Sequence, residues 1–224
     1  MSSAARASFA KTYRPVDTSD HRESVSLRLP EQHDTESCDT FIVKPFVVVI
    51  SGAPGSGKTT LAQELSRRLH VPQISRDDNK TGLHVTQDSN DPSEVWRSAE
   101  RAFELFYFVA SNYLRAGVSV MIEAAFHAGR SEADLNFLAE LGTCIHISLI
   151  TPTEVSLNRY RERALAGQRH PAHNDLAFAE QMESGSKDIN VYRLDLAAPC
   201  LKVDASYGWS PGLDAIAEFV ISSR

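Results

Sequence analysis

The stretch that decides the fold is Val47-Val48-Val49-Ile50-Ser51-Gly52-Ala53-Pro54-Gly55-Ser56-Gly57-Lys58-Thr59-Thr60. It is an apolar strand that runs into the pattern G-x-x-x-x-G-K-[ST], which cradles phosphate groups. Glycines let such a loop curl so that backbone N–H groups point at an anion, and the following helix presents its positive N-terminal end to the same anion. Leu61, Leu65 and Leu69 continue at helical spacing, so the pattern predicts a strand, a loop and an amphipathic helix in that order.

The loop residues have expected roles in binding a nucleoside triphosphate. We expect Lys58 to reach the β- and γ-phosphates, and the Thr59 hydroxyl to be a ligand of the Mg²⁺ that bridges them. The alternative, a glycine-rich turn that binds nothing, is disfavoured by the strand and helix on either side. The residues expected to contact the nucleotide are Gly52, Ala53, Pro54, Gly55, Ser56, Gly57, Lys58, Thr59 and Thr60.

The composition fits one globular domain with a tail. The chain has 224 residues, of which 42% are hydrophobic and 23% charged, and its net charge is −6. That charge argues against a protein that wraps nucleic acid, without excluding nucleic acid, and favours small-molecule partners. Three widely spaced cysteines without a C-x-x-C pattern indicate neither a disulfide framework nor a zinc site, so the expected compartment is the reducing cytoplasm.

No apolar run approaches the length of a membrane span, and the N-terminus lacks the hydrophobic core of a secretory signal. We therefore expect a soluble protein with no membrane partner. The sequence leaves the oligomeric state open.

Two regions of the chain differ in pattern. Residues 1–45 are polar, mixed in charge and without sustained periodicity, so we expect a flexible N-terminal extension, either a tail or a strap on the domain. In residues 46–224, apolar runs alternate with helical stretches, which predicts one α/β domain with a mainly parallel sheet and helices on both faces. Five strands are expected, at residues 47–51, 73–75, 118–122, 144–150 and 201–203.

Capping patterns mark three expected helix starts. A long helix is expected from Asp91-Pro92-Ser93-Glu94 to Gly117, a second from Thr151-Pro152-Thr153-Glu154, and a terminal helix from Ser210-Pro211. One face of the long helix is rich in aromatic residues. Core packing is the favoured interpretation of that face, and a substrate platform is the alternative.

Two acidic positions follow strands at the edge where open α/β sheets bind ligands. A carboxylate at Asp77 or Asp78, just after the second strand, could accept the proton of an attacking hydroxyl, although the local sequence alone favours capping of the next helix. Glu123 ends the third strand. Because a buried acid needs a partner, we expect Glu123 at the Mg²⁺ ion rather than in a structural salt bridge.

A cationic segment follows the fourth strand. Arg159 and Arg163 lie four residues apart on one expected helix face, and the sequence continues through Gly167-Gln168-Arg169-His170-Pro171. Because arginine matches phosphate bidentately, this segment is typical of a lid that delivers guanidinium groups to a transferring phosphoryl group. The alternative is a solvated basic helix face paired with Glu162.

The remaining polar residues give weaker signals. The eight histidines show no metal-ligand spacing, and His170 and His173 are expected in a surface loop, so no histidine is assigned to a metal. The acceptor pocket is expected between the segment after Asp77 and the long helix. Its possible lining residues are Arg76, Lys80, Trp96 and Arg97.

Together these elements resemble the P-loop kinases of the zeta-toxin, chloramphenicol phosphotransferase and polynucleotide kinase group. The resemblance covers about residues 46–222. The segments that carry it are Gly52–Thr59, Ile74–Asp78, Glu123–Phe126, the pair Arg159-x-x-x-Arg163, and Val203–Ser206.

The resemblance implies a role for several residues. By position, Asp77 is the general base on the acceptor hydroxyl, with Asp78 the less favoured candidate. Arg159 and Arg163 would clamp the ATP phosphates, with Arg169 less securely assigned. The loop from Asp204 to Tyr207 would help to hold the adenine.

Polynucleotide kinases of this group usually have aspartate where this chain has Glu123, followed by threonine or asparagine where it has Ala125 and Phe126. This difference favours a small-molecule acceptor.

The favoured function is therefore transfer of the γ-phosphoryl group of ATP, with Mg²⁺, to a hydroxyl of a small molecule such as a nucleoside, a sugar or an antibiotic. One alternative is a 5′-hydroxyl kinase for polynucleotides or a toxin-type kinase of nucleotide sugars. Another is a nucleotide-dependent switch ATPase. The sequence argues against a switch, because it lacks N-K-x-D for guanine and D-x-x-G after the third strand.

Overall fold

The computed structural model describes residues 44–86, 92–167, 173, 179–181, 183–184 and 189–224. The expected extension at residues 1–45 lies outside these residues except for its last two. Asp91, Arg169 and His170 lie outside them as well, as do the side chains of Trp96 and Arg97.

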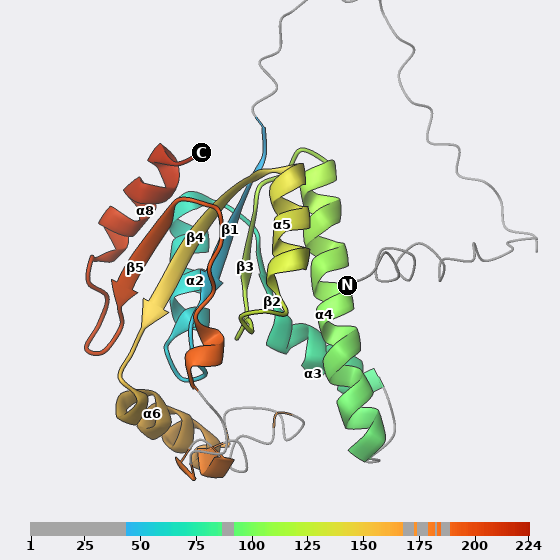
Figure 1. The fold of residues 1–224 in the computed structure, drawn as a ribbon, viewed down its shortest axis with the longest axis vertical. Coiled ribbons are helices and arrows are strands. Elements are labelled where there is room, and N and C mark those ends of the chain that lie inside the picture. The colour runs from blue at the N-terminus through green and yellow to red at the C-terminus, as the bar shows by residue number, and fades with distance from the viewer. Residues whose placement is uncertain (1–43, 87–91, 168–172, 174–178, 182, 185–188) are drawn as a thin grey trace, which may run out of the picture. The chain divides into compact units, whose positions relative to one another are not determined.

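Five parallel strands form one sheet in the order β2-β3-β1-β4-β5. The strands are β1 (Phe46–Ser51), β2 (Gln73–Ser75), β3 (Val120–Glu123), β4 (Thr143–Ile150) and β5 (Cys200–Asp204). This sheet confirms the expected α/β class. Because all strands run in the same direction, their carboxyl ends meet at one edge, where the arrowheads of Figure 1 point.

The central strand β1 is buried at every residue, between β3 and β4. Its sequence is therefore continuously apolar rather than alternating, as expected for a parallel strand covered on both faces. Its register pairs Ile50 with Glu123 of β3, and β2 pairs Ser75 with the same glutamate. The ends of three strands thus lie side by side around Glu123.

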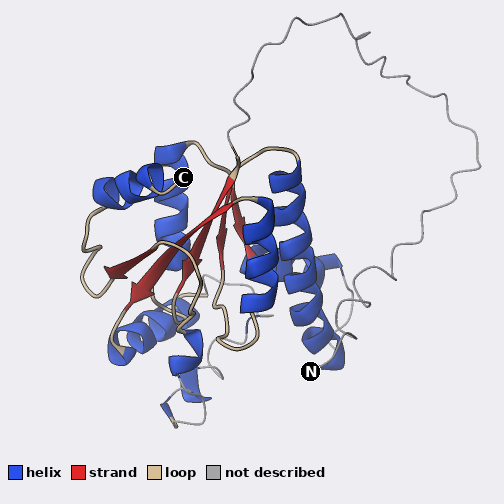
Figure 2. Ribbon diagram, turned by 45° about the horizontal axis from the view of Figure 1, so that its top comes forward, coloured by secondary structure: helices blue, strands red, loops and turns tan. Residues whose placement is uncertain are grey.

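Helices cover both faces of the sheet (Figures 1 and 2). On one face, α2 (Lys58–Leu69) and α8 (Leu213–Ser222) pack on Val48 and Ile50 of β1. On the other, α4 (Pro92–Arg115) and α5 (Glu132–Leu141) pack on Val47 and Val49. The alternating side chains of β1 therefore belong to two cores, one on each face.

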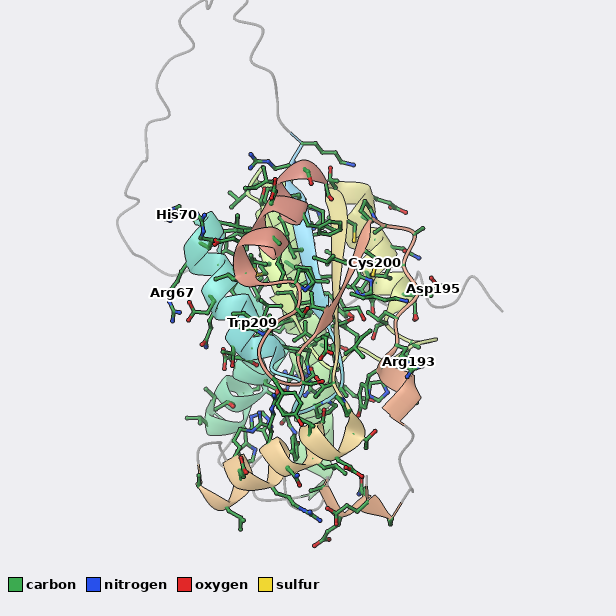
Figure 3. The ribbon with its side chains drawn as sticks, turned by 90° about the vertical axis from the view of Figure 1, so that its left-hand side faces the viewer. Arg67, His70, Arg193, Asp195, Cys200 and Trp209 are labelled. Atoms are coloured by element: carbon green, nitrogen blue, oxygen red, sulfur yellow. The ribbon has the colours of Figure 1, made fainter. Side chains whose placement is uncertain are left out.

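Figure 3 shows both layers from the β5 side. The labelled Arg67 and His70 lie at the end of α2 on one side of the sheet, while Arg193 and Asp195 lie on the other side. Trp209 lies in the connection from β5 to α8 and packs against the core under those elements.

Three further elements lie towards the carboxyl edge of the sheet. They are α3 (Arg76–Thr86), α6 (Thr153–Leu165) and the short 3-10 helix η2 (Ile189–Tyr192). Figure 1 shows α6 below the arrowheads of β4 and β1, and α3 beside the lower half of α4. None of the described helices is both long and apolar enough to cross a membrane.

Two predicted helix starts are wrong. The helix after β4 begins at Thr153, one residue later than predicted, because the backbone of Pro152 is extended at ψ 142° and makes this residue the N-cap; no side chain caps the helix. The terminal helix begins at Leu213 and not at Ser210-Pro211. The backbone of Ser210 instead forms an antiparallel bridge with Asp204, in which both N···O distances are 2.9 Å.

Candidate active site

The loop between β1 and α2 is shaped to receive an anion. Gly57, at φ 88°, is the N-cap residue of α2, and no side chain caps the helix. The first N–H groups of α2 are therefore left for another acceptor, and the helix dipole favours a negative one. Gly55, at φ 82°, passes so close to α6 that an added Cβ would lie 2.2 Å from the carbonyl oxygen of Ser156.

Two side chains of this loop fit a phosphate group. Lys58 is 7% exposed, and its Nζ donates a hydrogen bond to the carbonyl oxygen of Ala53 at 2.8 Å. That bond holds the ammonium group folded over the loop, where it could exchange the carbonyl for a phosphate oxygen. The buried Ser56 hydroxyl has no hydrogen-bond partner among the described residues.

A buried histidine, which sequence reasoning missed, fixes the strand end from which the loop starts. His146 of β4 places its Nε2 atom 2.8 Å from the hydroxyl oxygen of Ser51, the last residue of β1, and both side chains are buried. Burial lowers the pKa of His146 to about 4, so the imidazole is neutral near pH 7. No spacing pattern could identify this pair, because 95 residues separate its members.

Thr59 and Glu123 meet as the sequence predicts. The Thr59 hydroxyl donates a hydrogen bond to Oε1 of Glu123 at 3.1 Å. Glu123 is buried, which raises its pKa, while the Lys58 charge and the Ser75 and Thr59 hydrogen bonds act in the opposite direction. A hydroxyl and a carboxylate held together beside a phosphate loop fit Mg²⁺, which binds few protein oxygens together with substrate phosphates.

One cavity of about 860 Å³ joins this loop to the segments after β2 and β3. On its donor side it is lined by Lys58, Thr59, Glu123 and Arg163. The opposite side is built by α3, α4, the loop after β3 and η2. Its lining residues are Arg76, Asp77, Lys80, Ala99, Glu100, Phe103, Glu104, Tyr107, Ala125, His127, Arg130, Ser131, Asp134, His173 and Tyr192.

Asp77 lies in the first turn of α3 and lines the cavity, whereas the exposed Asp78 does not line it. Arg76 donates from Nη1 to Oδ1 of Asp77 at 3.1 Å and from Nη2 to the carbonyl oxygen of Ala99 at 3.3 Å. The Arg76 guanidinium also lies over the Phe103 ring, 4.6 Å from its centroid. Arg76 is thereby fixed, and it orients the carboxylate of Asp77.

Aromatic rings form much of the acceptor side. Phe103 and Tyr107 of α4 stack with centroids 6.1 Å apart, and His127 meets Tyr192 edge to face at 5.0 Å. On the aromatic face of α4, Phe106 is fully buried in the core, as the core-packing interpretation expects, while Phe103 and Tyr107 pack on the same core and also line the cavity. No sequence pattern indicates a role for Tyr192.

The two candidate lid arginines have different surroundings. Arg163 lines the cavity, and its guanidinium lies over the Tyr160 ring at 4.8 Å. Arg159 points elsewhere, donating from Nη1 to the carbonyl oxygen of Ala205 at 2.8 Å and from Nη2 to that of Ser206 at 2.6 Å. The structure therefore brings Arg163, but not Arg159, together with Lys58 and Asp77.

The loop after β5, expected at the adenine, is the segment that Arg159 holds. Its turn is closed by a hydrogen bond from the Ser206 backbone N–H to Oδ1 of Asp204 at 2.8 Å. Tyr207 extends from the turn with 96% of its surface exposed.

The surface location expected for His173 is wrong. Its side chain is only 6% exposed and lines the cavity. Nε2 lies 2.9 Å from the Thr81 hydroxyl, and Nδ1 lies 3.9 Å from Oδ1 of Asp77. These contacts to α3 explain the burial, and the sequence around His173 carries no sign of them.

A phosphate loop after the central strand of a parallel sheet, with a threonine and a glutamate at its mouth, defines a P-loop NTPase. More narrowly, the chain belongs to the family described as an AAA domain, whose model matches residues 47–186. No curated protein matches the chain.

Solved structures extend this comparison. The chain is similar, at 28% identity and a TM-score of 0.69, to a protein from Chloroflexus aurantiacus described as a "putative kinase", over 81% of this chain and 99% of that one. It shares its fold with the APS kinase CysC of Mycobacterium tuberculosis, at 16% identity and a TM-score of 0.51, over 80% of this chain and 97% of that one. These likenesses support the broad group of P-loop kinases and not a particular subgroup.

Proposed function

We propose that this protein transfers the γ-phosphoryl group of ATP to a hydroxyl group of a small molecule, with Mg²⁺ as cofactor. The observation that carries the proposal is that one cavity holds both halves of such a site, with Lys58, Thr59 and Glu123 on one side and Asp77 on the other. A nucleotide switch has no need of a second half lined by an aspartate and stacked aromatic rings.

In the proposed reaction, the acceptor hydroxyl oxygen attacks the γ-phosphorus in line with the bond that breaks. A new P–O bond forms, the electron pair of the old bond remains on the β-phosphate oxygen of ADP, and the hydroxyl proton passes to Asp77. Most of the rate enhancement in such transfers comes from positioning and charge stabilisation. Arg76, through its hydrogen bond to Oδ1, holds Asp77 in place for this proton transfer.

The charges of the donor side fit the same reaction. Lys58 would neutralise the β- and γ-phosphate oxygens, and Arg163 would stabilise the charge that spreads over the transferring group. Thr59 and Glu123 would hold Mg²⁺, which would supply positive charge that offsets the charge of the phosphates. A phosphate clamp at Arg159 would require its guanidinium to exchange the carbonyls of Ala205 and Ser206 for phosphate.

The acceptor is proposed to be small because Phe103, Tyr107 and Tyr192 bound its side of the cavity, and because Glu100 and Glu104 line it as well. These carboxylates, together with Lys80 and Arg130 on the same side, can form hydrogen bonds with the hydroxyl groups of a nucleoside, sugar or antibiotic. We place the protein in the cytoplasm and propose residues 46–224 as the kinase domain, on the sequence grounds given above.

The test is incubation of the full-length protein with γ-labelled ATP, Mg²⁺ and a panel of nucleosides, sugars, antibiotics and 5′-hydroxyl oligonucleotides. The proposal predicts a labelled small molecule, and it predicts that Asp77→Asn abolishes most of the labelling while ATP still binds. The matched control is Asp78→Asn, the exposed neighbour, which should label normally. If only an oligonucleotide is labelled, the proposed class of acceptor is wrong. If Asp77→Asn labels the acceptor as fully as wild type, the assignment of Asp77 as the base is wrong.

A further inference from the structure

His173 reaches the candidate base from a distant part of the chain. Among the described residues it follows α6 by eight positions, yet its side chain is 94% buried against α3. Nδ1 faces Oδ1 of Asp77 at 3.9 Å, and Nε2 lies 2.9 Å from the Thr81 hydroxyl oxygen. The imidazole therefore makes a hydrogen bond at Nε2 and faces the carboxylate of Asp77 at Nδ1, and these two groups lie one helical turn apart on α3.

The hydroxyl of Thr81 decides which ring nitrogen carries a proton. It donates its single proton to the backbone carbonyl oxygen of Asp77 at 3.1 Å, so it accepts from Nε2–H of His173. A neutral ring protonated at Nε2 would turn the Nδ1 lone pair towards the carboxylate. An imidazolium would turn an N–H towards it instead.

Two side chains then face the same oxygen of Asp77. Arg76, from α3 itself, lies 3.1 Å away, and His173 lies at 3.9 Å. The other charged side chains that line the cavity are Lys58, Lys80, Glu100, Glu104, Glu123, Arg130, Asp134 and Arg163. Contacted through Oδ1 from two directions, the carboxylate of Asp77 keeps one orientation.

We propose that His173 is a positioning residue for Asp77, holding the base in the orientation that accepts the acceptor's proton. The inference rests on the proposed role of Asp77 as that base. His173 itself exchanges no proton with substrate and acts only through the carboxylate. Helix α6 carries Arg163 on the donor side. His173, which follows α6, contributes to the acceptor side.

A double-mutant cycle tests the coupling. The full-length proteins are wild type, Asp77→Asn, His173→Gln and the double variant, with Mg·ATP and water in the acceptor's place as the probe. We expect His173→Gln to lower kcat by about 3–10-fold with less than about a two-fold change in KM for ATP, and to have no further effect in the Asp77→Asn background. The matched control is His84→Gln, since His84 lies on α3 but does not line the cavity.

Imidazole NMR gives a readout that does not depend on turnover. Removing the Asp77 charge should move the titration midpoint of the His173 ring to lower pH by at least about 0.5 unit, and leave that of His84 in place. An unmoved midpoint, or a His173→Gln effect that is fully additive with Asp77→Asn, would overturn the inference.

The outcomes also separate this inference from the proposed function. If Asp77→Asn impairs turnover and His173→Gln does not, the function stands and the inference falls. If Asp77→Asn turns over ATP like wild type while the midpoint still moves, the contact is real but the base is misassigned, so the inference falls, and the labelling of a small molecule decides the proposed function separately. Thermal unfolding of each variant shows that a lost rate does not come from a lost fold.

Discussion

Lys58 is the residue on which nucleotide binding depends most. Its ammonium group is almost fully buried over the loop, so no other described cation can take its place at that point. We expect Lys58→Ala to weaken ATP binding and to lower phosphoryl transfer by about 10²–10³-fold, the loss typical of one preorganised charge. Titration calorimetry with ATP and the transfer assay measure both. Lys44→Ala removes an exposed lysine just before β1 and is the control; binding by Lys58→Ala as tight as by this control would contradict the assignment.

Glu123 predicts a dependence of stability on pH. Burial raises the pKa of this carboxyl above its ordinary value of 4.5. A group whose pKa rises on folding contributes stability that is present below the unfolded pKa and lost as pH rises through the folded pKa. In EDTA, the Tm of Glu123→Gln should therefore exceed that of wild type increasingly as pH rises above 4.5, each kcal/mol being worth about 2–4 °C.

The same pair of proteins tests the metal assignment. With Mg²⁺ and ATP, the wild type should become the more stable of the two proteins. The carboxylate of Glu123 supplies a charged ligand beside Thr59, whereas the amide of Glu123→Gln does not. Melting curves across pH 4–8, with and without Mg·ATP, are the measurement. A wild type that is the more stable protein without metal at every pH would refute this account of Glu123.

At the scale of elements, the phosphate loop and α6 are in direct contact at Gly55. A Cβ there would lie 2.2 Å from the Ser156 carbonyl oxygen, whereas a Cβ at Gly57 would have nothing within 4 Å. Both glycines have positive φ, so both alanine variants carry a similar backbone strain, about 1–2 kcal/mol. Gly55→Ala should lose more stability than Gly57→Ala, because only Gly55→Ala must also push α6 away. Equal losses in chemical denaturation would show that the loop and α6 are not coupled there.

Arg159 connects α6 to the loop after β5. Its two hydrogen bonds to the carbonyls of Ala205 and Ser206 predict that Arg159→Ala destabilises the protein by about 1–3 kcal/mol. Arg163→Ala should change stability less and phosphoryl transfer more, since Arg163 lines the cavity. The measurements are the free energy of unfolding, from chemical denaturation, and the rate of phosphoryl transfer of both variants. The opposite pattern would restore Arg159 as the phosphate clamp.

The elements differ in how well their sequence predicted them. The five strands and the helix after the loop follow from apolar runs and spacing, because burial in a parallel sheet leaves a continuous pattern. The first residues of α6 and α8 could not be predicted from the capping patterns in the sequence. At Ser210 a long-range bridge to Asp204 overrides the local capping signal, and local sequence contains no information about such a bridge.

For the whole molecule, the sheet order explains why the candidate site could be largely predicted. Parallel strands bring Ser51, Ser75 and Glu123 to one edge, so residues that follow strands gather there irrespective of their separation in sequence. Asp77, Glu123 and Thr59 were predictable in this way. His173, Tyr192 and His146 were not, because their positions depend on how the segments pack together and not on a strand end.

The fate of the γ-phosphoryl group tests the central claim most directly. Phosphorus-31 NMR of the full-length protein with Mg·ATP and the acceptor panel follows every phosphorus atom in one sample. The account predicts ADP together with an equal amount of a new phosphomonoester resonance, and loss of that resonance in Asp77→Asn. ADP with inorganic phosphate alone, at a rate that no acceptor changes, would contradict it and identify a nucleotide hydrolase instead.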